Sequence, residues 1–174
     1  MARTPTTSIP LGFEAPPFTL PDVVSGTLKN SADLMSGGPT VVVFMCNHCP
    51  FVVHILPEYV RFAKEYMTKG VNFIAISSND IAGYPMDSPD LMKTLAQEMD
   101  FCFPYLYDES QDVAKAYAAA CTPDFSVFDI DNRCVYRGQF DGARPGNETP
   151  VTGTDMRAVL DLLLAGQSIP KKDQ

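Results

Sequence analysis

The sequence predicts an α/β fold in which helices flank a mixed central sheet. Two runs, 39–45 and 71–77, are apolar without alternation, which is the pattern of central strands covered on both faces. Helical periodicity follows the first run over residues 51–66. Later in the chain, 125–129 and 134–140 have strand composition and are joined by a turn-rich link, as in a hairpin. Parallel strands joined by helical crossovers, together with an antiparallel hairpin, make a mixed sheet.

Shorter elements complete this pattern. Ser88 and Pro89 supply an N-cap and a first-turn proline for an amphipathic helix that extends to residue 99. Gly166 ends a final helix over 154–165. We also expect short edge strands at 18–20 and 26–29, an extended piece at 103–106 and a helix over 110–120.

The length of 174 residues fits one domain, and no repeat or linker divides the chain. We therefore predict a single domain over residues 1–174. The first part is rich in proline, so 1–17 is expected to be an extended N-terminal segment laid against the domain. Residues 167–174 are expected to form a mobile tail.

Charge and composition exclude several kinds of partner. The net charge is −8 and basic residues do not cluster, so most of the surface would repel nucleic acid and anionic membranes. No apolar run has signal-peptide length or approaches the roughly 20 residues needed to cross a bilayer. We therefore expect a cytoplasmic protein, whose reducing surroundings argue against structural disulfides among the five cysteines.

The strongest chemical signal is the pair Cys46 and Cys49, between the first central strand and its helix. Pro50 suits the first helical position, and a residue before proline is pushed out of the α region, so Cys49 is the expected N-cap. A sulfur there faces unpaired backbone N–H groups and the positive end of the helix dipole. Both should lower its pKa below the free value of about 8.5. Cys46 is close enough in sequence to form a small disulfide ring with it.

Other polar and sulfur-bearing side chains have more than one reading. His48 either stabilises the thiolate and shuttles a proton, or is a solvent-facing turn residue. Cys46, His48 and Cys49 could together hold copper(I) or zinc, but no fourth ligand is evident, and we predict neither a metal nor a cofactor. Cys102 and Cys134 are expected to be core or chemically passive residues.

A wider pattern surrounds these residues. It comprises Gly12–Pro16 with Phe18–Leu20, Val41–Pro57, Phe103–Leu106, Cys121–Phe125 and Tyr136–Gly138. In these segments the chain resembles the thioredoxin-like redoxin superfamily, the alkyl hydroperoxide reductase/thiol-specific antioxidant (AhpC/TSA) group, and within it the peroxiredoxin-like thioredoxin-family proteins. The resemblance implies a thioredoxin fold with an N-terminal extension.

The resemblance also implies roles for particular residues. Thr122–Pro123 occupies the place of a Thr-Pro pair whose cis peptide bond faces the nucleophilic cysteine and whose backbone binds an extended partner; the alternative is an ordinary trans proline. In similar extracytoplasmic reductases a proline follows the attacking cysteine by eight residues. Pro57 stands in that place relative to Cys49, which makes Cys49, and not Cys46, the expected nucleophile.

The chain also departs from the peroxiredoxin pattern. Cys46 stands where a peroxiredoxin has threonine or serine, and Val42 stands where it has proline. The arginine that polarises peroxide has no counterpart near Asp124. Either Arg137 or Arg144 could point at the active site, but a solvated surface position is the favoured expectation for both.

The preferred function is a thiol–disulfide oxidoreductase in which Cys49 attacks and Cys46 resolves the mixed disulfide, with Cys121 as the alternative resolving thiol or else a small core residue. Its expected partners are a disulfide-bearing protein or a small-molecule thiol or peroxide substrate, a thiol reductant for recycling, and a second copy in a possible homodimer. The other candidates are a peroxiredoxin-like thiol peroxidase and a non-catalytic thiol- or metal-binding module.

Overall fold

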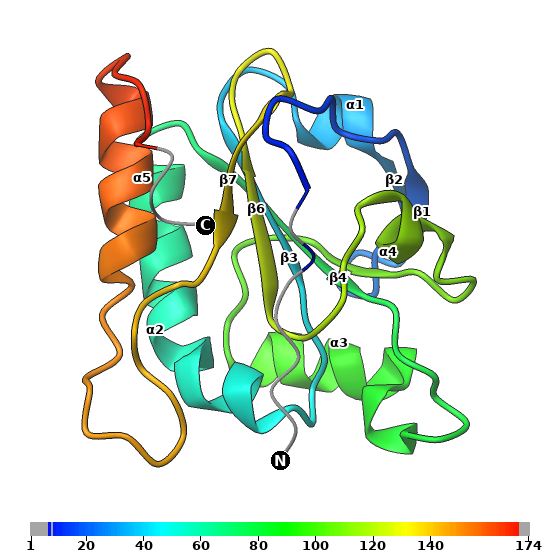
Figure 1. Ribbon diagram of the computed structural model, residues 1–174. Coiled ribbons are helices and arrows are strands. Elements are labelled where there is room, and N and C mark those ends of the chain that lie inside the picture. Colours follow the sequence, from blue (N-terminus) through cyan, green and yellow to red (C-terminus); the bar gives the residue numbers. More distant parts are fainter. Residues whose placement is uncertain (1–6, 8, 171–174) are drawn as a thin grey trace.

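The computed structural model describes residues 7 and 9–170, and Figure 1 shows its elements. The strands are β1 (Thr19–Pro21), β2 (Leu28–Asn30), β3 (Thr40–Phe44), β4 (Asn72–Ser77), β5 (Tyr105–Tyr107), β6 (Asp124–Phe128) and β7 (Cys134–Gly138). The helices are α1 (Ser31–Leu34), α2 (Pro50–Met67), α3 (Pro89–Glu98), α4 (Asp112–Ala116) and α5 (Thr154–Leu164), with a 3-10 turn, η1, at Pro85–Asp87.

Strands β5, β4, β3, β6 and β7 lie in that order in one mixed sheet. The pairs β3–β4 and β4–β5 are parallel, whereas β3–β6 and β6–β7 are antiparallel. Strands β1 and β2 form a separate antiparallel pair. This arrangement confirms the predicted mixed sheet flanked by helices, and it places the β3–α2 junction at the centre of the fold.

The central strand β3 is buried along its whole length because helices cover both faces of the sheet. Val41 and Val43 face a core shared with α2, α3 and α5, and Val42 and Phe44 face a second core that includes residues of α1 and α4. Figure 1 shows α2 and α5 on one side of the sheet and α1 and α4 on the other. An unbroken apolar run is what such a doubly covered strand requires.

The described part of the N-terminal segment pairs with the start of β7. The amide of Gly12 donates to the carbonyl of Cys134 at 2.8 Å, and the amide of Cys134 donates to the carbonyl of Phe13 at 2.9 Å. The described residues around Gly12 and Phe13 therefore lie against the sheet. Residues 1–6 and 8 of the predicted extended segment lie outside the described residues, as do 171–174 of the predicted tail.

Several predicted boundaries were wrong. The helix expected over 110–120 spans Asp112–Ala116. It ends there because Ala118 has a φ of 51° and because the guanidinium of Arg137 binds the carbonyls of Tyr117 and Ala118. The extended piece expected at 103–106 is the strand Tyr105–Tyr107.

The second hairpin strand and one short helix also differ from expectation. The strand predicted over 134–140 ends at Gly138. After it, the hydroxyl of Tyr136 donates to the carbonyl of Gln139 at 2.8 Å as the chain turns away from the sheet. Helix α1 was not predicted because its four residues are too few to show a period; Asn30 caps it by accepting from the amide of Asp33 at 2.9 Å.

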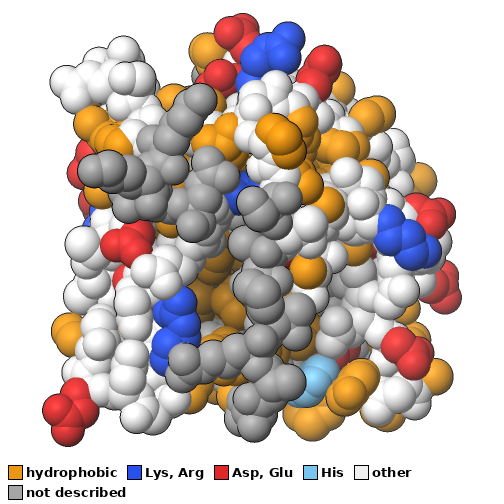
Figure 2. Space-filling model, in the orientation of Figure 1, with side chains coloured by type: hydrophobic (Ala, Val, Ile, Leu, Met, Phe, Trp, Pro, Cys, Tyr) orange, Lys and Arg blue, Asp and Glu red, His pale blue; other side chains and the backbone are white. Residues whose placement is uncertain are grey.

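One face of the molecule is hollowed. Figure 2, in the orientation of Figure 1, shows hydrophobic side chains on the floor of this hollow. The hollow lies beside the β3–α2 junction and α5, where the cavity described below opens. Within the described ranges, no helix combines the length and the apolarity needed to cross a membrane.

Candidate active site

The predicted N-cap is confirmed. Cys49 has extended backbone angles (φ −64°, ψ 121°) and α2 begins at Pro50. Because proline lacks an N–H and has a fixed φ, it enters the first turn without losing a hydrogen bond. The strand-to-helix turn therefore holds the Cys49 sulfur at the start of the longest helix in the described chain.

The surroundings of the Cys49 sulfur favour its ionised form. They lower the pKa of the thiol to about 5, mainly because the Cys46 thiol donates to it, and further because of the Thr122 hydroxyl and the amides of Val52 and Phe51. Burial acts in the opposite direction. The helix amides act on the sulfur without forming a regular cap hydrogen bond. Cys49 is therefore a thiolate at neutral pH.

Cys46 has the opposite character. Its side chain is 1% exposed, and its Sγ lies 3.6 Å from the Thr122 hydroxyl. Interaction with Cys49 and burial raise the pKa of the Cys46 thiol far above its ordinary value. The two sulfurs thus share one proton, which Cys46 keeps, and Cys49 is the sulfur that solvent and substrate can reach.

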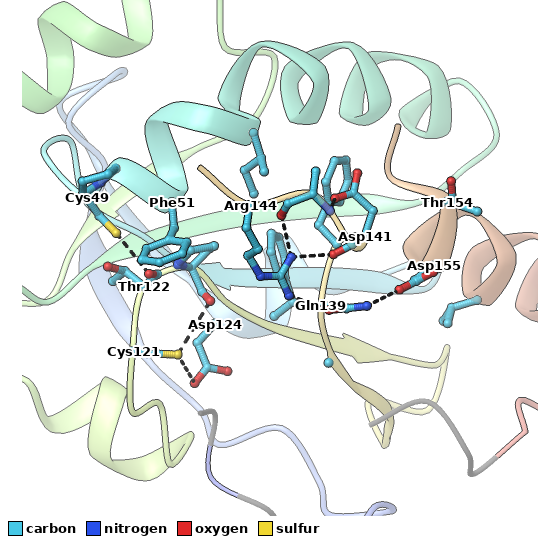
Figure 3. A pocket seen from close by; sticks show the side chains of 18 of the residues that line it. Cys49, Phe51, Cys121, Thr122, Asp124, Gln139, Asp141, Arg144, Thr154 and Asp155 are labelled. Atoms are coloured by element: carbon cyan, nitrogen blue, oxygen red, sulfur yellow. Dashed lines mark hydrogen bonds between the residues drawn. The ribbon is translucent and has the colours of Figure 1, made fainter. Parts of the chain in front are cut away.

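Thr122 and Pro123 lie against both sulfurs, and the peptide bond between them is cis. The Thr122 carbonyl oxygen is 3.1 Å from the Cys49 Sγ and accepts from it when the thiol is protonated. Figure 3 shows Cys49 pointing toward Thr122. The segment before β6 and the segment before α2 therefore meet at the reactive sulfur, although more than 70 residues separate them in sequence.

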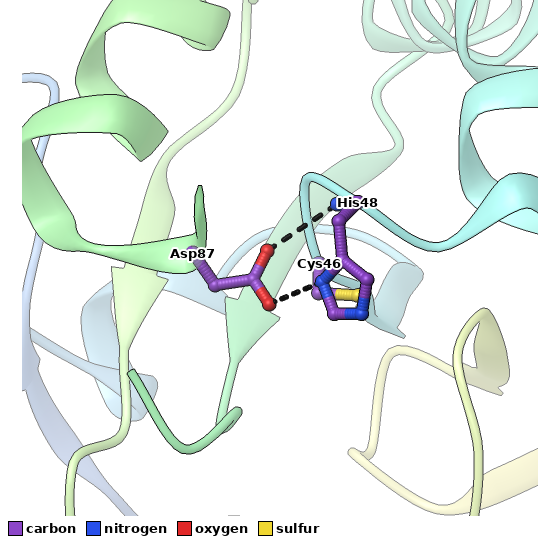
Figure 4. A group of neighbouring side chains, drawn as sticks. All are labelled: Cys46, His48 and Asp87. Atoms are coloured by element: carbon purple, nitrogen blue, oxygen red, sulfur yellow. Dashed lines mark hydrogen bonds and ion pairs between the residues drawn. The ribbon is translucent and has the colours of Figure 1, made fainter. Parts of the chain in front are cut away.

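A buried carboxylate that the sequence analysis missed fixes the loop between the two cysteines. Asp87 has no exposed surface. It accepts from the amides of Asn47 (2.8 Å) and His48 (3.3 Å), and from the side chain of Asn79 (2.8 Å). The His48 Nδ1 lies 2.6 Å from the same carboxylate, as Figure 4 shows. His48 also stacks on the ring of Tyr84.

These contacts argue against His48 as a solvent-facing turn residue, while its role toward the Cys49 thiolate stays a prediction. His48 is half-buried and held by Asp87 and Tyr84, so it is not a free turn residue. One ligand atom each from Cys46, His48 and Asp87 also lie within 4.8 Å of one another. The Asp87 carboxylate is already engaged by several donors, and with His48 it forms a hydrogen-bonded support for the loop; the Cys46 sulfur instead faces the Thr122 hydroxyl.

The site opens into a cavity of about 1210 Å³. Its lining joins both cysteines to side chains from α2, β6, the loop after β7, and α5. Its apolar lining residues include Phe51, Phe125, Phe140 and Leu162. A cavity that is mainly apolar, with a few convergent polar groups and a thiolate, has the character of a ligand site.

The sequence of residues 11–140 matches the AhpC/TSA family. The chain belongs to this family. Among curated proteins none matches it. An uncharacterized conserved protein from Geobacillus kaustophilus is 54% identical, with a TM-score of 0.97 over 100% of this chain and 92% of that one. A hypothetical protein from Sinorhizobium meliloti is 43% identical, with a TM-score of 0.95 over 98% and 93%.

More distant structures share the fold. The peroxidoxin BcpB from Mycobacterium tuberculosis is 19% identical, with a TM-score of 0.66 over 90% of this chain and 96% of that one. A thiol:disulfide interchange protein of the thioredoxin family from Chlorobium tepidum is 18% identical, with a TM-score of 0.66 over 94% and 99%. The thioredoxin fold of this AhpC/TSA protein is therefore established, and its family consists of thiol redox proteins.

Arg137 was wrongly predicted to be a solvated surface residue. It is 2% exposed, and its guanidinium lies 3.3 Å from the buried carboxylate of Asp124. It also binds the carbonyls of Tyr117 and Ala118. In this AhpC/TSA protein, the arginine near Asp124 thus stabilises that buried carboxylate and the backbone carbonyls of the segment before the Thr122–Pro123 turn.

Cys121 lines the same cavity as Cys49. Its Sγ lies 3.8 Å from the carbonyl of Pro123 and 3.9 Å from the carboxylate of Asp124. Burial and, to a smaller extent, the charge of Asp124 raise the pKa of its thiol to about 11. Cys121 is therefore protonated at neutral pH and less available for attack than Cys49. Cys102, expected to be core or passive, is half-buried against the core, and Cys134 is buried.

Proposed function

We propose that this protein is a thiol–disulfide oxidoreductase that uses Cys49 as the attacking thiolate and Cys46 as the resolving thiol. The observation that supports it most is the contrast between two neighbouring sulfurs, one half-exposed with a low pKa and one buried with its proton. A low pKa provides the nucleophile at neutral pH, and a buried partner is protected from outside reagents.

The proposed reaction has two exchange steps. The Cys49 thiolate attacks one sulfur of a substrate disulfide, forms a mixed disulfide and releases the other sulfur as a thiolate. Cys46 then loses its proton and attacks the Cys49 sulfur, which releases the reduced substrate and leaves a Cys46–Cys49 disulfide. Two electrons pass to the substrate, and an external dithiol reductant returns two electrons and two protons to the enzyme.

The first step prepares the second. The proton of Cys46 is held mainly because Cys49 accepts it. Once Cys49 is part of a mixed disulfide it carries no charge, and the largest influence that raises the Cys46 pKa is gone. The resolving thiol is thus activated only when there is a mixed disulfide to resolve.

The test is to expose the reduced protein to a glutathione redox buffer and identify the cysteines that crosslink by mass spectrometry. Wild type should form a Cys46–Cys49 disulfide reversibly, Cys46→Ser should accumulate glutathione on Cys49, and Cys49→Ser should do neither. Cys102→Ser is the matched control because its thiol is half-buried and lies outside the cavity lining. A Cys49–Cys121 crosslink would show that Cys121, and not Cys46, is the resolving residue. An unmodified Cys49 would refute the proposal.

Peroxide reduction is the second candidate, supported by the low pKa of Cys49 and by membership of the AhpC/TSA family. In that reaction the thiolate attacks a peroxide oxygen, becomes a sulfenic acid and releases an alcohol or water. The guanidinium of Arg137 is bound to Asp124 and to backbone carbonyls, which counts against its polarising a peroxide. Rapid peroxide consumption dependent on Cys49 would favour this reaction over disulfide exchange.

We also propose that the reaction takes place in the cytoplasm. That compartment would supply the dithiol reductants that the proposed reaction needs.

A further inference from the structure

The mouth of the cavity holds an arginine that the two-cysteine reaction does not use. Arg144 lies in the loop between β7 and α5 and lines the same cavity as Cys49. The sequence left two positions open for it, with the solvated surface favoured over the active site; the structure shows it partly buried and in the cavity lining. Figure 3 shows its side chain beside Phe51, between Cys49 and Asp141.

The loop that carries Arg144 is held in place by a buried carboxylate. Asp141 accepts from the amides of Ala143 (2.9 Å), Thr152 (2.8 Å) and Gly153 (2.7 Å). These contacts join the start of the loop to its end, directly before α5. The position of Arg144 in the cavity is therefore built by the fold and does not depend on a ligand.

The guanidinium is oriented without being neutralised. Its Nη1 donates to the carbonyls of Asp141 (2.7 Å) and Ala143 (2.6 Å), and its Nη2 donates to the side-chain oxygen of Gln139. All three acceptors are uncharged. Of the five N–H donors of an arginine, the Nε–H and one Nη2–H have no acceptor among the described residues. Adjacent donors of this kind match the two oxygens of a carboxylate.

The carboxylates that line the cavity form no ion pair with the Arg144 guanidinium, because each is engaged elsewhere. Asp124 pairs with Arg137, and Asp141 is occupied by the loop amides. Asp155 accepts from Gln139 at 2.7 Å, so Gln139 stands between it and Arg144, as Figure 3 shows. No salt bridge to Arg144 occurs within the described part of the chain.

Apart from the charge of Arg144, much of the cavity lining is apolar. Phe125 and Phe140 stack with their centroids 5.9 Å apart, and Phe51 and Leu162 add to the same lining. A ligand that fits this cavity therefore has an apolar or aromatic body and an acidic end group.

From this arrangement we propose that the substrate is a small disulfide that carries a carboxylate, which binds Arg144 while the apolar body fills the cavity and a sulfur reaches Cys49. This inference rests on the proposed disulfide exchange and specifies its substrate class. Arg144 would bind and position the substrate, and the electrons and protons would move as in the two exchange steps above.

The test uses two aromatic disulfides that differ in charge, dithiobis(nitrobenzoate), which carries carboxylates, and dithiodipyridine, which is neutral near pH 7. The rate constant of the fast phase that disappears in Cys49→Ser is measured for each. Arg144→Gln should slow the anionic reagent about tenfold, the effect of losing one ion pair in a partly enclosed site, and change the neutral reagent less than about twofold. Added salt should reduce the preference of wild type for the anionic reagent.

Two further variants separate charge from structure. Arg144→Lys keeps the charge and should retain most of the rate with the anionic reagent. Arg133→Gln makes the same change in net charge at an exposed position outside the cavity lining, and both rates should stay within about twofold of wild type. If Arg144→Gln slowed both reagents equally, or neither, the substrate class would be refuted while disulfide exchange would stand. A wild type without a fast Cys49 phase would refute both.

Discussion

Replacing Cys46 with alanine should raise the pKa of the Cys49 thiol. The Cys46 thiol is the largest of the influences that lower this pKa, ahead of the Thr122 hydroxyl and the amides of Val52 and Phe51. Alanine offers no donor at that position. Burial, which favours the neutral thiol, would then meet less opposition.

The size of the effect follows from the loss of one hydrogen bond to a charged sulfur. Such a bond contributes about 1.5–3 kcal/mol, and about 1.4 kcal/mol corresponds to one pKa unit, so the midpoint should rise from about 5 by roughly one to two units. A thiolate of higher pKa is also the stronger nucleophile, by about threefold per unit. The variant should therefore react more slowly than wild type near pH 5 and faster near pH 9.

The assay is the rate of Cys49 alkylation by iodoacetamide between pH 4 and 10, followed by mass spectrometry of the modified residue. Cys46→Ser keeps a hydroxyl donor and should give an intermediate midpoint. Cys102→Ala removes a half-buried thiol that does not act on Cys49 and should leave the midpoint at about 5. If Cys46→Ala and wild type had the same midpoint, the inference that the Cys46 thiol donates a hydrogen bond to the Cys49 thiolate would be refuted.

Three other predictions concern stability, each measured by urea unfolding. Asp87→Asn presents an amide N–H to the Asn79 donor and loses charge-assisted bonds, so it should cost about 2–3 kcal/mol. Arg137→Met leaves the Asp124 carboxylate buried without its cation and should cost about 3–5 kcal/mol. The lowered pKa of Cys49 means that the unfolded chain binds more protons between its ordinary value of 9.0 and about 5. The stability of wild type relative to Cys49→Ser should therefore rise with pH across that window and be lost as pH falls through about 5.

Each stability prediction has a matched control. Asp131→Asn and Arg133→Met make the same chemical changes at exposed positions and should shift the free energy of unfolding by less than about 0.5 kcal/mol. The stability of wild type relative to Cys134→Ser should not rise with pH across the same window, because burial raises the pKa of the Cys134 thiol to about 12. A cost below about 0.5 kcal/mol for Asp87→Asn would mean that the carboxylate does not hold the loop.

The parts of the site that depend on neighbours in sequence could be predicted. The N-cap position of Cys49 follows from the proline beside it, and the central strands follow from unbroken apolar runs. Asp87 could not be found in this way, because it approaches the loop only through the fold, from about 40 residues away. A single buried aspartate in a polar stretch has no sequence pattern that distinguishes it from a solvated one.

The arginines show the same limit. Arg137 is buried because its guanidinium binds Asp124 and backbone carbonyls that lie far from it in sequence. Arg144 enters the cavity because Asp141 closes its loop. Neither contact has a local signal. The single-domain boundaries, the cytoplasmic location, the homodimer and the absence of a metal or cofactor remain predictions.

The burial of Cys46 imposes an order of events on the chemistry. A reagent in solution meets one sulfur only, since the other is 1% exposed behind the Thr122 hydroxyl. In the proposed exchange reaction, every mixed disulfide would therefore form on Cys49 and be resolved by attack of the buried Cys46 on that sulfur. The burial of Cys46 would also prevent adducts on its own sulfur, which would stall the proposed turnover until an outside thiol removed them.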